Sequence, residues 1–330
     1  MEQSNVEKLF KCIDEVTEII QSAKEEIYLE SLILSLDILL SDEARDELDD
    51  ITKRKITKLV QTFNEVEFDA ETYRKAIGLS ILKGMKGAAQ PQHLMTPDTV
   101  SLLISYLVNK LIDKKGQVTI FDPASGTANL LTAVLNQMEN PVKAYASEVD
   151  QTLIEIAVLN ANLQRREVSF YHQDSLRPFL IEPVDMVVTD LPVGYYPDDV
   201  TAGEYQLKSD EGHSYSHHLF IEQSLKYLKD SGFFVGVIPE FLFESDQSDK
   251  LHAFLHEKAH IVGVIRLPET SFKSKNQAKS VLILQKKGKG TKEPKQPLLV
   301  QLPSFKNARA MADIVEQMNQ WFTSYPNRIK

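Results

Sequence analysis

From about residue 92 onward, short runs rich in β-branched residues alternate with stretches whose apolar residues have the spacing of helices. This alternation is typical of an α/β unit with a mostly parallel sheet. Helices fit between the runs, for instance over 128–138 and 216–229. We therefore predict a doubly wound, Rossmann-like α/β fold that binds its ligands beyond the carboxyl ends of the strands. The seven predicted strands are 117–122, 142–147, 168–171, 184–190, 232–238, 261–266 and 280–285.

The first 88 residues have a different pattern, because they contain no proline and many Glu and Lys residues. Apolar residues between Val6 and Ile20 recur three or four positions apart, which predicts amphipathic helices. The first glycine is Gly78, and further Gly and Pro residues over 84–92 indicate a boundary. We expect an N-terminal all-α domain over 1–88 and a second domain over 89–330.

The cysteine content and the length of the apolar runs indicate the cellular compartment of the protein. Its one cysteine, Cys12, excludes an intramolecular disulfide and a cysteine-based zinc site. The longest apolar runs, such as 31–40, are interrupted by polar residues and are shorter than the ~20 residues that span a bilayer. The first ten residues lack the basic and apolar segments of a secretion signal. We therefore expect a cytoplasmic globular protein with no membrane partner.

The net charge of −10 is spread unevenly. Residues 1–270 hold 44 acidic and 25 basic side chains, whereas residues 271–330 hold 3 acidic and 12 basic ones. An acidic chain argues against tight binding of nucleic acid, which depends on neutralising phosphates. The lysines over 286–292 are either a nucleic-acid contact or a solvated loop.

The first strand of the predicted sheet leads directly into a turn and a helix, with the sequence Asp-Pro-Ala-Ser-Gly-Thr-Ala-Asn over 122–129. Gly126 allows the backbone to approach a ligand, and the helix N-terminus offers free N–H groups. Because Ala128 stands at the second glycine position, the segment fits a nicotinamide dinucleotide poorly. Taken alone, a tight turn without a ligand is an equally good interpretation.

Acidic residues follow each of the next strands. Glu148 lies about 20 residues after the glycine, where an acid hydrogen-bonds a ribose diol, and Asp174 and Asp190 follow the third and fourth strands. One such acid is usually a helix cap. Together with Asp122, however, there are four in consecutive units, and these indicate a ligand site. Upstream, Thr96 is the predicted N-cap of a helix, with Pro97 at its first position.

These motifs resemble the class I S-adenosylmethionine-dependent adenine-N6 methyltransferases of the modification-subunit type found in restriction systems. Within that family the sequence is most similar to the bacterial YtxK-type proteins, over about residues 92–285. Residues 93–97 resemble the segment at the cofactor methionine, and 122–128 resemble the D-P-A-x-G-x-G cofactor loop. Asp190-Leu-Pro-Val193 stands where the family has its N/D-P-P-aromatic tetrapeptide.

The resemblance implies S-adenosyl-L-methionine as cofactor, with Glu148 at its ribose and Asp174 at its adenine. The cofactor-binding residues that it implies are Met95, Thr96, Pro97, Asp122, Pro123, Ala124, Gly126, Thr127, Ala128, Asn129, Glu148, Val149, Asp174, Ser175, Asp190 and Pro192. The catalytic residues that it implies are Asp190, Leu191, Pro192 and Val193, joined by Tyr195 or Tyr196.

An adenine amino nitrogen is a poor nucleophile, because its lone pair is delocalised into the ring. The Asp190 side chain and a carbonyl beside Pro192 can accept its two N–H hydrogens, and the proline makes that carbonyl rigid. Leu191 and Val193 depart from the family, since the second residue is no proline and the fourth is no aromatic. Tyr195 or Tyr196 either supplies the missing stacking ring or packs the loop against the sheet.

Several functions remain open from the sequence. Transfer to adenine N6 of DNA is the leading hypothesis, and the alternatives are transfer to a protein glutamine or to RNA, or a catalytically inactive cofactor-binding and assembly module. Residues 286–330 are too few for a target-recognition domain. We therefore expect a partner subunit, or a homodimer formed through the N-terminal helices.

The histidines do not predict a metal site. They fall in two groups, and we expect caps, surface positions and loops for them, because no carboxylate pattern accompanies them. The groups are His213, His217 and His218, and His252, His256 and His260, of which His260 is expected to begin a strand.

Overall fold

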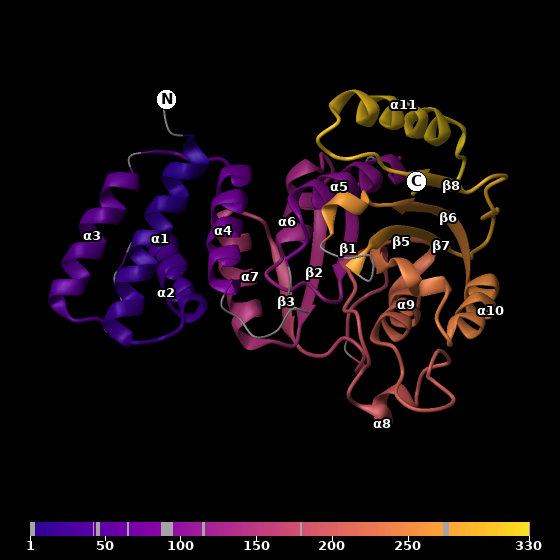
Figure 1. The fold of residues 1–330 in the computed structure, drawn as a ribbon, viewed down its shortest axis with the longest axis horizontal. Coiled ribbons are helices and arrows are strands. Elements are labelled where there is room, and N and C mark those ends of the chain that lie inside the picture. The colour runs from indigo at the N-terminus through magenta and orange to yellow at the C-terminus, as the bar shows by residue number, and fades with distance from the viewer. Residues whose placement is uncertain are drawn as a thin grey trace.

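The computed structural model describes residues 4–41, 43, 47–64, 66–86, 95–113, 116–178, 180–272 and 277–329. Within these residues the chain forms an N-terminal helical region beside a sheet covered by helices on both faces (Figure 1). The helices are α1 Asn5–Lys24, α2 Tyr28–Ser41, α3 Asp50–Asn64, α4 Ala70–Met85, α5 Asp98–Leu111, α6 Asn129–Gln137, α7 Gln151–Leu163, α8 Asp199–Ala202, α9 Ser216–Tyr227, η2 Glu240–Phe243, α10 Ser248–Lys258, η3 Glu269–Ser271 and α11 Ala308–Ser324.

Helices α1 to α4 form the helical region that the sequence pattern predicts. Helix α1 begins with a capping box, in which the Ser4 hydroxyl accepts the Glu7 N–H and the Glu7 carboxylate accepts the Ser4 N–H. Its apolar stripe packs with α2, α4 and α7 in one core, whose buried members include Ile13, Leu36 and Ile77. The helical region thus shares a hydrophobic core with a helix of the α/β region. The predicted boundary over 84–92 lies largely outside the described residues.

The sheet has eight strands in the order β3-β2-β1-β4-β5-β7-β6-β8. The strands are β1 Val118–Asp122, β2 Val142–Glu148, β3 Val168–His172, β4 Val184–Asp190, β5 Leu228–Pro239, β6 Ala259–Arg266, β7 Lys279–Lys286 and β8 Leu298–Gln301. Among the strands of the described residues, β7 alone runs antiparallel to its neighbours, β5 and β6, so the mostly parallel α/β fold is confirmed. The order reverses between β1 and β4, which makes their carboxyl ends the expected place for a ligand.

All seven predicted strands form, and the eighth, β8, is the difference from the sequence analysis. It has four residues between Pro297 and Pro303, so its run is short and framed by residues that favour loops. It pairs in parallel with β6 at the sheet edge, and Leu299 is largely exposed there. The one-sided burial of an edge strand leaves little hydrophobic pattern to detect.

Two hydrophobic cores cover the two faces of the sheet. Helices α5, α6 and α11 pack on one face, and α9 and α10 pack on the other (Figure 1). The carboxyl ends of β1, β2 and β4 carry Asp122, Glu148 and Asp190. Among the described helices, none combines the length and the apolar character needed to cross a membrane.

Candidate functional site

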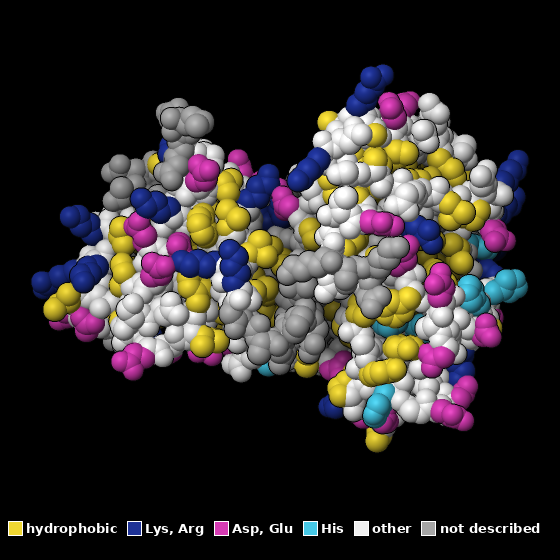
Figure 2. Space-filling view, viewed as in Figure 1, with side chains coloured by type: hydrophobic (Ala, Val, Ile, Leu, Met, Phe, Trp, Pro, Cys, Tyr) yellow, Lys and Arg dark blue, Asp and Glu magenta, His cyan; other side chains and the backbone are white. Residues whose placement is uncertain are grey.

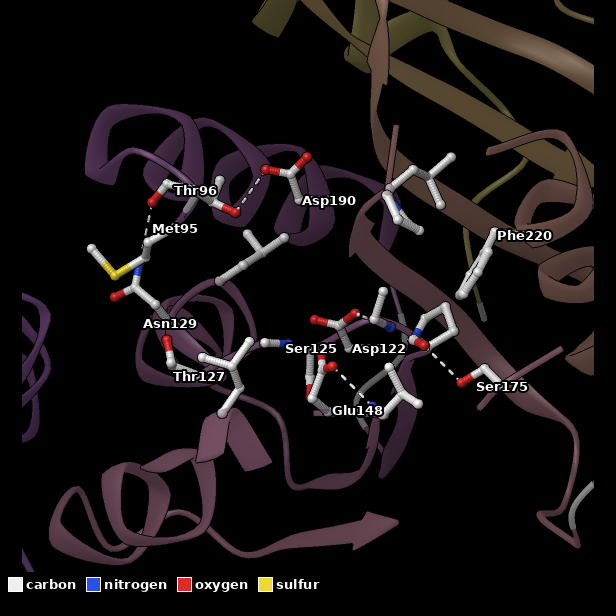
Figure 3. A pocket seen from close by; sticks show the side chains of 18 of the residues that line it. Met95, Thr96, Asp122, Ser125, Thr127, Asn129, Glu148, Ser175, Asp190 and Phe220 are labelled. Carbon is white, nitrogen blue, oxygen red and sulfur yellow. Dashed lines mark hydrogen bonds between the residues drawn. The ribbon is translucent and has the colours of Figure 1, made fainter. Parts of the chain in front are cut away.

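A cavity of about 270 Å³ lies at the carboxyl ends of β1 and β4, where the strand order reverses (Figure 3). Its volume is close to the lower end of the range for small-molecule sites, ~300–1,000 Å³. The described residues that line it are Met85, Met95, Thr96, Asp122, Pro123, Ala124, Ser125, Gly126, Thr127, Asn129, Leu130, Glu148, Val149, Leu153, Gln173, Asp174, Ser175, Asp190, Leu191, Pro192, Phe220 and Lys279.

Most of the residues predicted from sequence therefore meet in one place. Those that line the cavity are Met95, Thr96, Asp122, Pro123, Ala124, Gly126, Thr127, Asn129, Glu148, Val149, Asp174, Ser175, Asp190, Leu191 and Pro192. Those that do not line it are Pro97, Ala128, Val193, Tyr195 and Tyr196. The predicted His93, at the start of the 93–97 segment, lies outside the described residues. The individual roles of all these residues stay predictions.

The turn between β1 and α6 has two residues in the left-handed backbone region. Gly126 has a φ of 53°, and a side chain there would meet open space. Ala128, at the second glycine position of the family loop, has a φ of 59° and is completely buried. Left-handed geometry costs an alanine about 1–2 kcal/mol. The loop therefore keeps the geometry that a glycine provides, although the residue is alanine.

Asp122 ends β1 and is almost completely buried, at 1% exposure. Its carboxylate accepts the Ala124 N–H at 3.1 Å. The pKa of Asp122 is raised to about 7, chiefly by burial and to a smaller extent by the nearby Glu148 and Asp190 carboxylates, against the opposing hydrogen bond from Ala124. Its protonation state consequently changes near neutral pH.

Glu148 ends β2 and is held by backbone N–H groups. One of its oxygens accepts the Gly126 N–H at 2.8 Å, and the other accepts those of Val149 and Asp150 at 2.8 and 2.9 Å. A carboxylate has about four lone-pair sites. The three bonds thus fix its orientation and leave acceptor capacity facing the cavity for a hydroxyl group.

Asp174 follows β3 and is also fixed by the protein. Its carboxylate accepts the Leu176 N–H at 2.9 Å and the Tyr196 hydroxyl at 2.5 Å. The neighbouring Ser175 donates its hydroxyl to the Pro123 carbonyl at 2.6 Å. The Ser175 contact joins the loop after β3 to the loop after β1 (Figure 3), and the Tyr196 contact joins it to the loop after β4.

Asp190 ends β4 and has a protein donor on each carboxylate oxygen. The Thr96 hydroxyl donates to one at 2.9 Å, and the Lys279 ammonium lies 2.7 Å from the other. Thr96 is therefore not the N-cap that the sequence predicts, and Pro97 precedes α5 without a side-chain cap. An N-cap hydroxyl would accept a neutral backbone N–H, whereas here the Thr96 hydroxyl donates to a charged carboxylate. The bond to the charged group is the stronger one, which accounts for the position of the hydroxyl.

The two tyrosines after the tetrapeptide have different surroundings. Tyr196 is buried and bonded to Asp174, and its pKa is raised by burial and then by that carboxylate. Tyr195 is 61% exposed and stacks on Tyr215, with ring centroids 4.9 Å apart and planes 13° from parallel. Val193, at the aromatic position of the family, is partly exposed. Of the two tyrosines, only Tyr195 presents a ring to solvent.

The first histidine group corrects the sequence expectation. His217 and His218 are completely buried in α9, and burial lowers the pKa of His217 to about 3 and that of His218 to about 4. His213 is exposed and lies 3.0 Å from Asp199. The apolar environment, which sequence spacing does not reveal, explains the burial. Over the described ranges, no group of three or more His, Cys, Asp or Glu side chains is placed to hold a metal ion.

Seven of the described lining residues were not predicted from sequence: Met85, Ser125, Leu130, Leu153, Gln173, Phe220 and Lys279. Lys279 and Phe220 lie on elements that follow β4 in the chain. Lys279 begins β7, and a lysine before an apolar run is typical of a solvated strand end. Phe220 lies within α9 and is only 8% exposed, so in the sequence it cannot be distinguished from a core residue. Neither position gives a local signal, because both reach the cavity through tertiary packing.

The reversed strand order, with acids at or just after the ends of β1 to β4, matches a class I S-adenosylmethionine-dependent methyltransferase fold. The chain belongs to the N-6 DNA Methylase family, whose family model matches residues 80–317. Residues 7–85 match a second family model, the YtxK N-terminal helical domain.

Three relatives illustrate this membership. YtxK of Bacillus subtilis (strain 168), which is named as uncharacterized, is 44% identical over 326 residues, covering 98% of this chain and 99% of that protein. The crystal structure of a candidate class I S-adenosylmethionine-dependent methyltransferase from Listeria monocytogenes has a TM-score of 0.91 and 39% identity, over 96% of this chain and 99% of that one. The methylase subunit of the type I restriction enzyme EcoEI from Escherichia coli is 25% identical, over 72% of this chain and 52% of that protein.

S-adenosyl-L-methionine is the expected cofactor of this family, and the donor set of the cavity fits it. Glu148 keeps acceptor capacity for ribose hydroxyls. The N-terminus of α6 offers free N–H groups for a carboxylate. The carboxylates of Asp122, Asp174 and Asp190 line the cavity that would hold the sulfonium cation.

Proposed function

We propose that this chain transfers a methyl group from S-adenosylmethionine to an exocyclic amino nitrogen, and that this nitrogen is N6 of adenine in DNA. The observation that carries the proposal is Asp190 at the end of β4, with Pro192 beside it, in the same cavity as the cofactor loop. Membership of the N-6 DNA Methylase family supports the choice of adenine N6.

The bound cofactor supplies a methyl group that its sulfonium already activates. The residues of the chain then have to hold and orient the amino group. Asp190 accepts one N–H, the carbonyl next to Pro192 accepts the other, and the proline limits the motion of that carbonyl. The nitrogen would become positively charged as its bond to the methyl group forms and the bond from sulfur to that group breaks, and the Asp190 carboxylate stabilises that charge. Release of one N–H proton then leaves the neutral methylated amine and the neutral demethylated cofactor.

A DNA substrate requires contacts beyond this cavity. On the face shown in Figure 2, Lys and Arg side chains are dispersed among Asp and Glu side chains. In the basic C-terminal segment, Lys286 and Lys287 donate to the carbonyls of Leu228 and His256 at 2.7 and 2.6 Å. Because the EcoEI relative is a subunit of a restriction enzyme, we propose that a partner subunit of this chain supplies most of the DNA contacts.

A second function has one observation in its favour. Both oxygens of Asp190 already have protein donors, Thr96 and Lys279, and Val193 offers no aromatic ring. A chain with this site can bind S-adenosylmethionine without transferring its methyl group and can act as an assembly module. The position of Asp190 supports the transfer reaction, and the protein donor on each of its carboxylate oxygens supports the module.

One assay separates these functions. Full-length protein is incubated with methyl-labelled S-adenosylmethionine and unmethylated genomic DNA, tRNA or cell protein, and label in N6-methyladenine is measured after digestion. Asp190→Ala is the control, expected to abolish transfer while calorimetric affinity for the cofactor stays within a few fold. Label in tRNA or glutamine alone would contradict the DNA substrate. Cofactor binding without transfer to any of the three would favour the assembly module.

A further inference from the structure

Arg74 is a charged side chain buried in the helical region. It lies in α4 and is 1% exposed. Its guanidinium forms a two-pronged pair with Glu71 at 2.8 and 2.7 Å and an ion pair with Asp98 at 2.5 Å. The remaining prong donates to the Asn129 side-chain oxygen at 3.0 Å. One side chain of the helical region thus binds the first residue of α5 and the first residue of α6.

From Asn129 the hydrogen bonds continue into the cavity. The Asn129 amide donates to the Thr96 carbonyl at 3.3 Å, and the Thr96 hydroxyl donates to Asp190 at 2.9 Å (Figure 3). A hydrogen-bonded series therefore joins α4 to the end of β4. Asn129, Thr96 and Asp190 all line the cavity, whereas Arg74 is not among its lining residues.

Helix α4 also packs directly on this wall of the cavity. A Cβ atom added to Gly78 would lie 3.6 Å from the Met95 methyl carbon and 3.8 Å from the Asn129 side-chain oxygen. Both are ordinary van der Waals distances, so the α4 backbone at this position lies next to the two cavity residues. Met95 and Asn129 are therefore held from the same side, by the α4 backbone at one position and by Arg74 at another.

The chemistry of Arg74 indicates that it holds its neighbours in fixed positions. A buried charge is costly unless every hydrogen-bonding group has a partner, and an apolar residue at this place would pack the helices more cheaply. The planar fork of arginine can hold two carboxylates and an amide at fixed angles, which the single ammonium of lysine cannot do. Arg74 thus fixes the relative positions of the N-termini of α5 and α6.

We propose that Arg74 is a positioning residue for the cofactor site, and that α4 forms the outer support of that site. Arg74 orients Asn129, and Asn129 orients the Thr96 segment, so binding of S-adenosylmethionine stabilises α4 in return. The helical region is then a working part of the cofactor site and not a separable module. This inference rests on cofactor binding at the proposed site.

The test compares two lysine or arginine positions on the same helix. Arg74→Lys and Arg74→Met remove the three-way contact, and Lys83→Met removes a matched pair of contacts that face α1, at 2.6 Å to Asp14 and 2.6 Å to Glu18. Calorimetry with S-adenosylmethionine and its demethylated product is done on full-length protein, with folding checked by circular dichroism. We expect both Arg74 variants to bind both ligands about threefold to thirtyfold more weakly, and Lys83→Met to bind them as the wild type does.

Hydrogen exchange of the wild-type protein provides a measurement that needs no variant. The amides over 70–85 should become more protected when S-adenosylmethionine binds, whereas those over 50–64, in α3, should not change. Unchanged exchange over 70–85, or equal cofactor affinity in the wild type and a folded Arg74→Lys, would overturn the inference and leave the proposed function intact. A wild-type protein that binds no cofactor would instead overturn the proposed function.

Discussion

Replacing Asp122 by asparagine tests the electrostatics of the site. Burial, with a smaller contribution from the Glu148 and Asp190 carboxylates, raises the pKa of Asp122 to about 7 from an ordinary value of 3.8. The pKa of Asp122 is higher in the folded protein than in the unfolded chain. At a pH between the two pKa values, the folded protein therefore holds a proton on Asp122 that the unfolded chain has lost. Stability is therefore highest in acid and falls as the pH rises through this range.

The size of the effect follows from the two pKa values. At roughly 1.4 kcal/mol for each pH unit between them, the ionised carboxylate costs about 4 kcal/mol of folding free energy above neutral pH. Between pH 5 and pH 8 the wild type loses about 2.5 kcal/mol of this stability. Asparagine does not titrate, and its oxygen can still accept the Ala124 N–H that Asp122 accepts now.

Urea unfolding of both proteins at pH 5, 6, 7 and 8 measures this term, because the other titrating groups cancel in the difference. We expect Asp122→Asn to gain about 2–3 kcal/mol relative to the wild type from pH 5 to pH 8. A difference that stays constant within about 0.5 kcal/mol over this range would refute the raised pKa. A difference that changes in the opposite direction would show that Asp122 is stabilised as an ion.

Three further substitutions test other parts of the site. Lys279→Met removes the cation beside Asp190. By calorimetry, the affinity for the cationic S-adenosylmethionine relative to that for its neutral demethylated product should rise about twofold to fivefold. An unchanged ratio of the two affinities would show that Lys279 does not repel the cofactor. Tyr195→Ala should weaken binding of an adenine-containing substrate and preserve cofactor affinity, and unaltered substrate affinity would exclude stacking on this ring. Ala128→Gly removes the strain of a left-handed alanine, which offsets the usual cost of glycine, so the free energy of unfolding should change by less than about 1 kcal/mol. Ala133→Gly, inside α6, has no such strain to remove and should lower the free energy of unfolding by about 1 kcal/mol. Equal losses in these two variants would contradict the strain.

The sequence predicts the seven principal strands because each is a β-branched run bounded by turn residues or by a helix. It also predicts most of the cavity, for a geometric reason. The carboxyl ends of parallel strands meet at one edge of the sheet, so residues such as Asp122, Glu148 and Asp190, which follow separate strands, must come together there. This inference needs only the order of elements along the chain.

Contacts between distant elements are the part that sequence reasoning does not reach. Charged side chains of an amphipathic helix usually face solvent, so no local pattern distinguishes Arg74, which is buried at 1% exposure by tertiary packing. Thr96 has the position of an N-cap, but its hydroxyl finds a carboxylate 94 residues away. In both cases the local sequence fits two surroundings, solvent or a buried contact for Arg74 and a helix N–H or a carboxylate for Thr96. Tertiary structure decides between them.

The charge of the cavity bears on how a DNA substrate would reach it. Among the described residues that line it, four carry carboxylates, Asp122, Glu148, Asp174 and Asp190, and one carries an ammonium, Lys279. An acidic excess suits a sulfonium and a nitrogen that becomes positive, but it repels phosphates. A target adenine must therefore enter as an extruded base, with its phosphates held outside the cavity. Tyr195 lies two residues after the tetrapeptide, and its exposed ring is placed to receive such a base outside the acidic cavity.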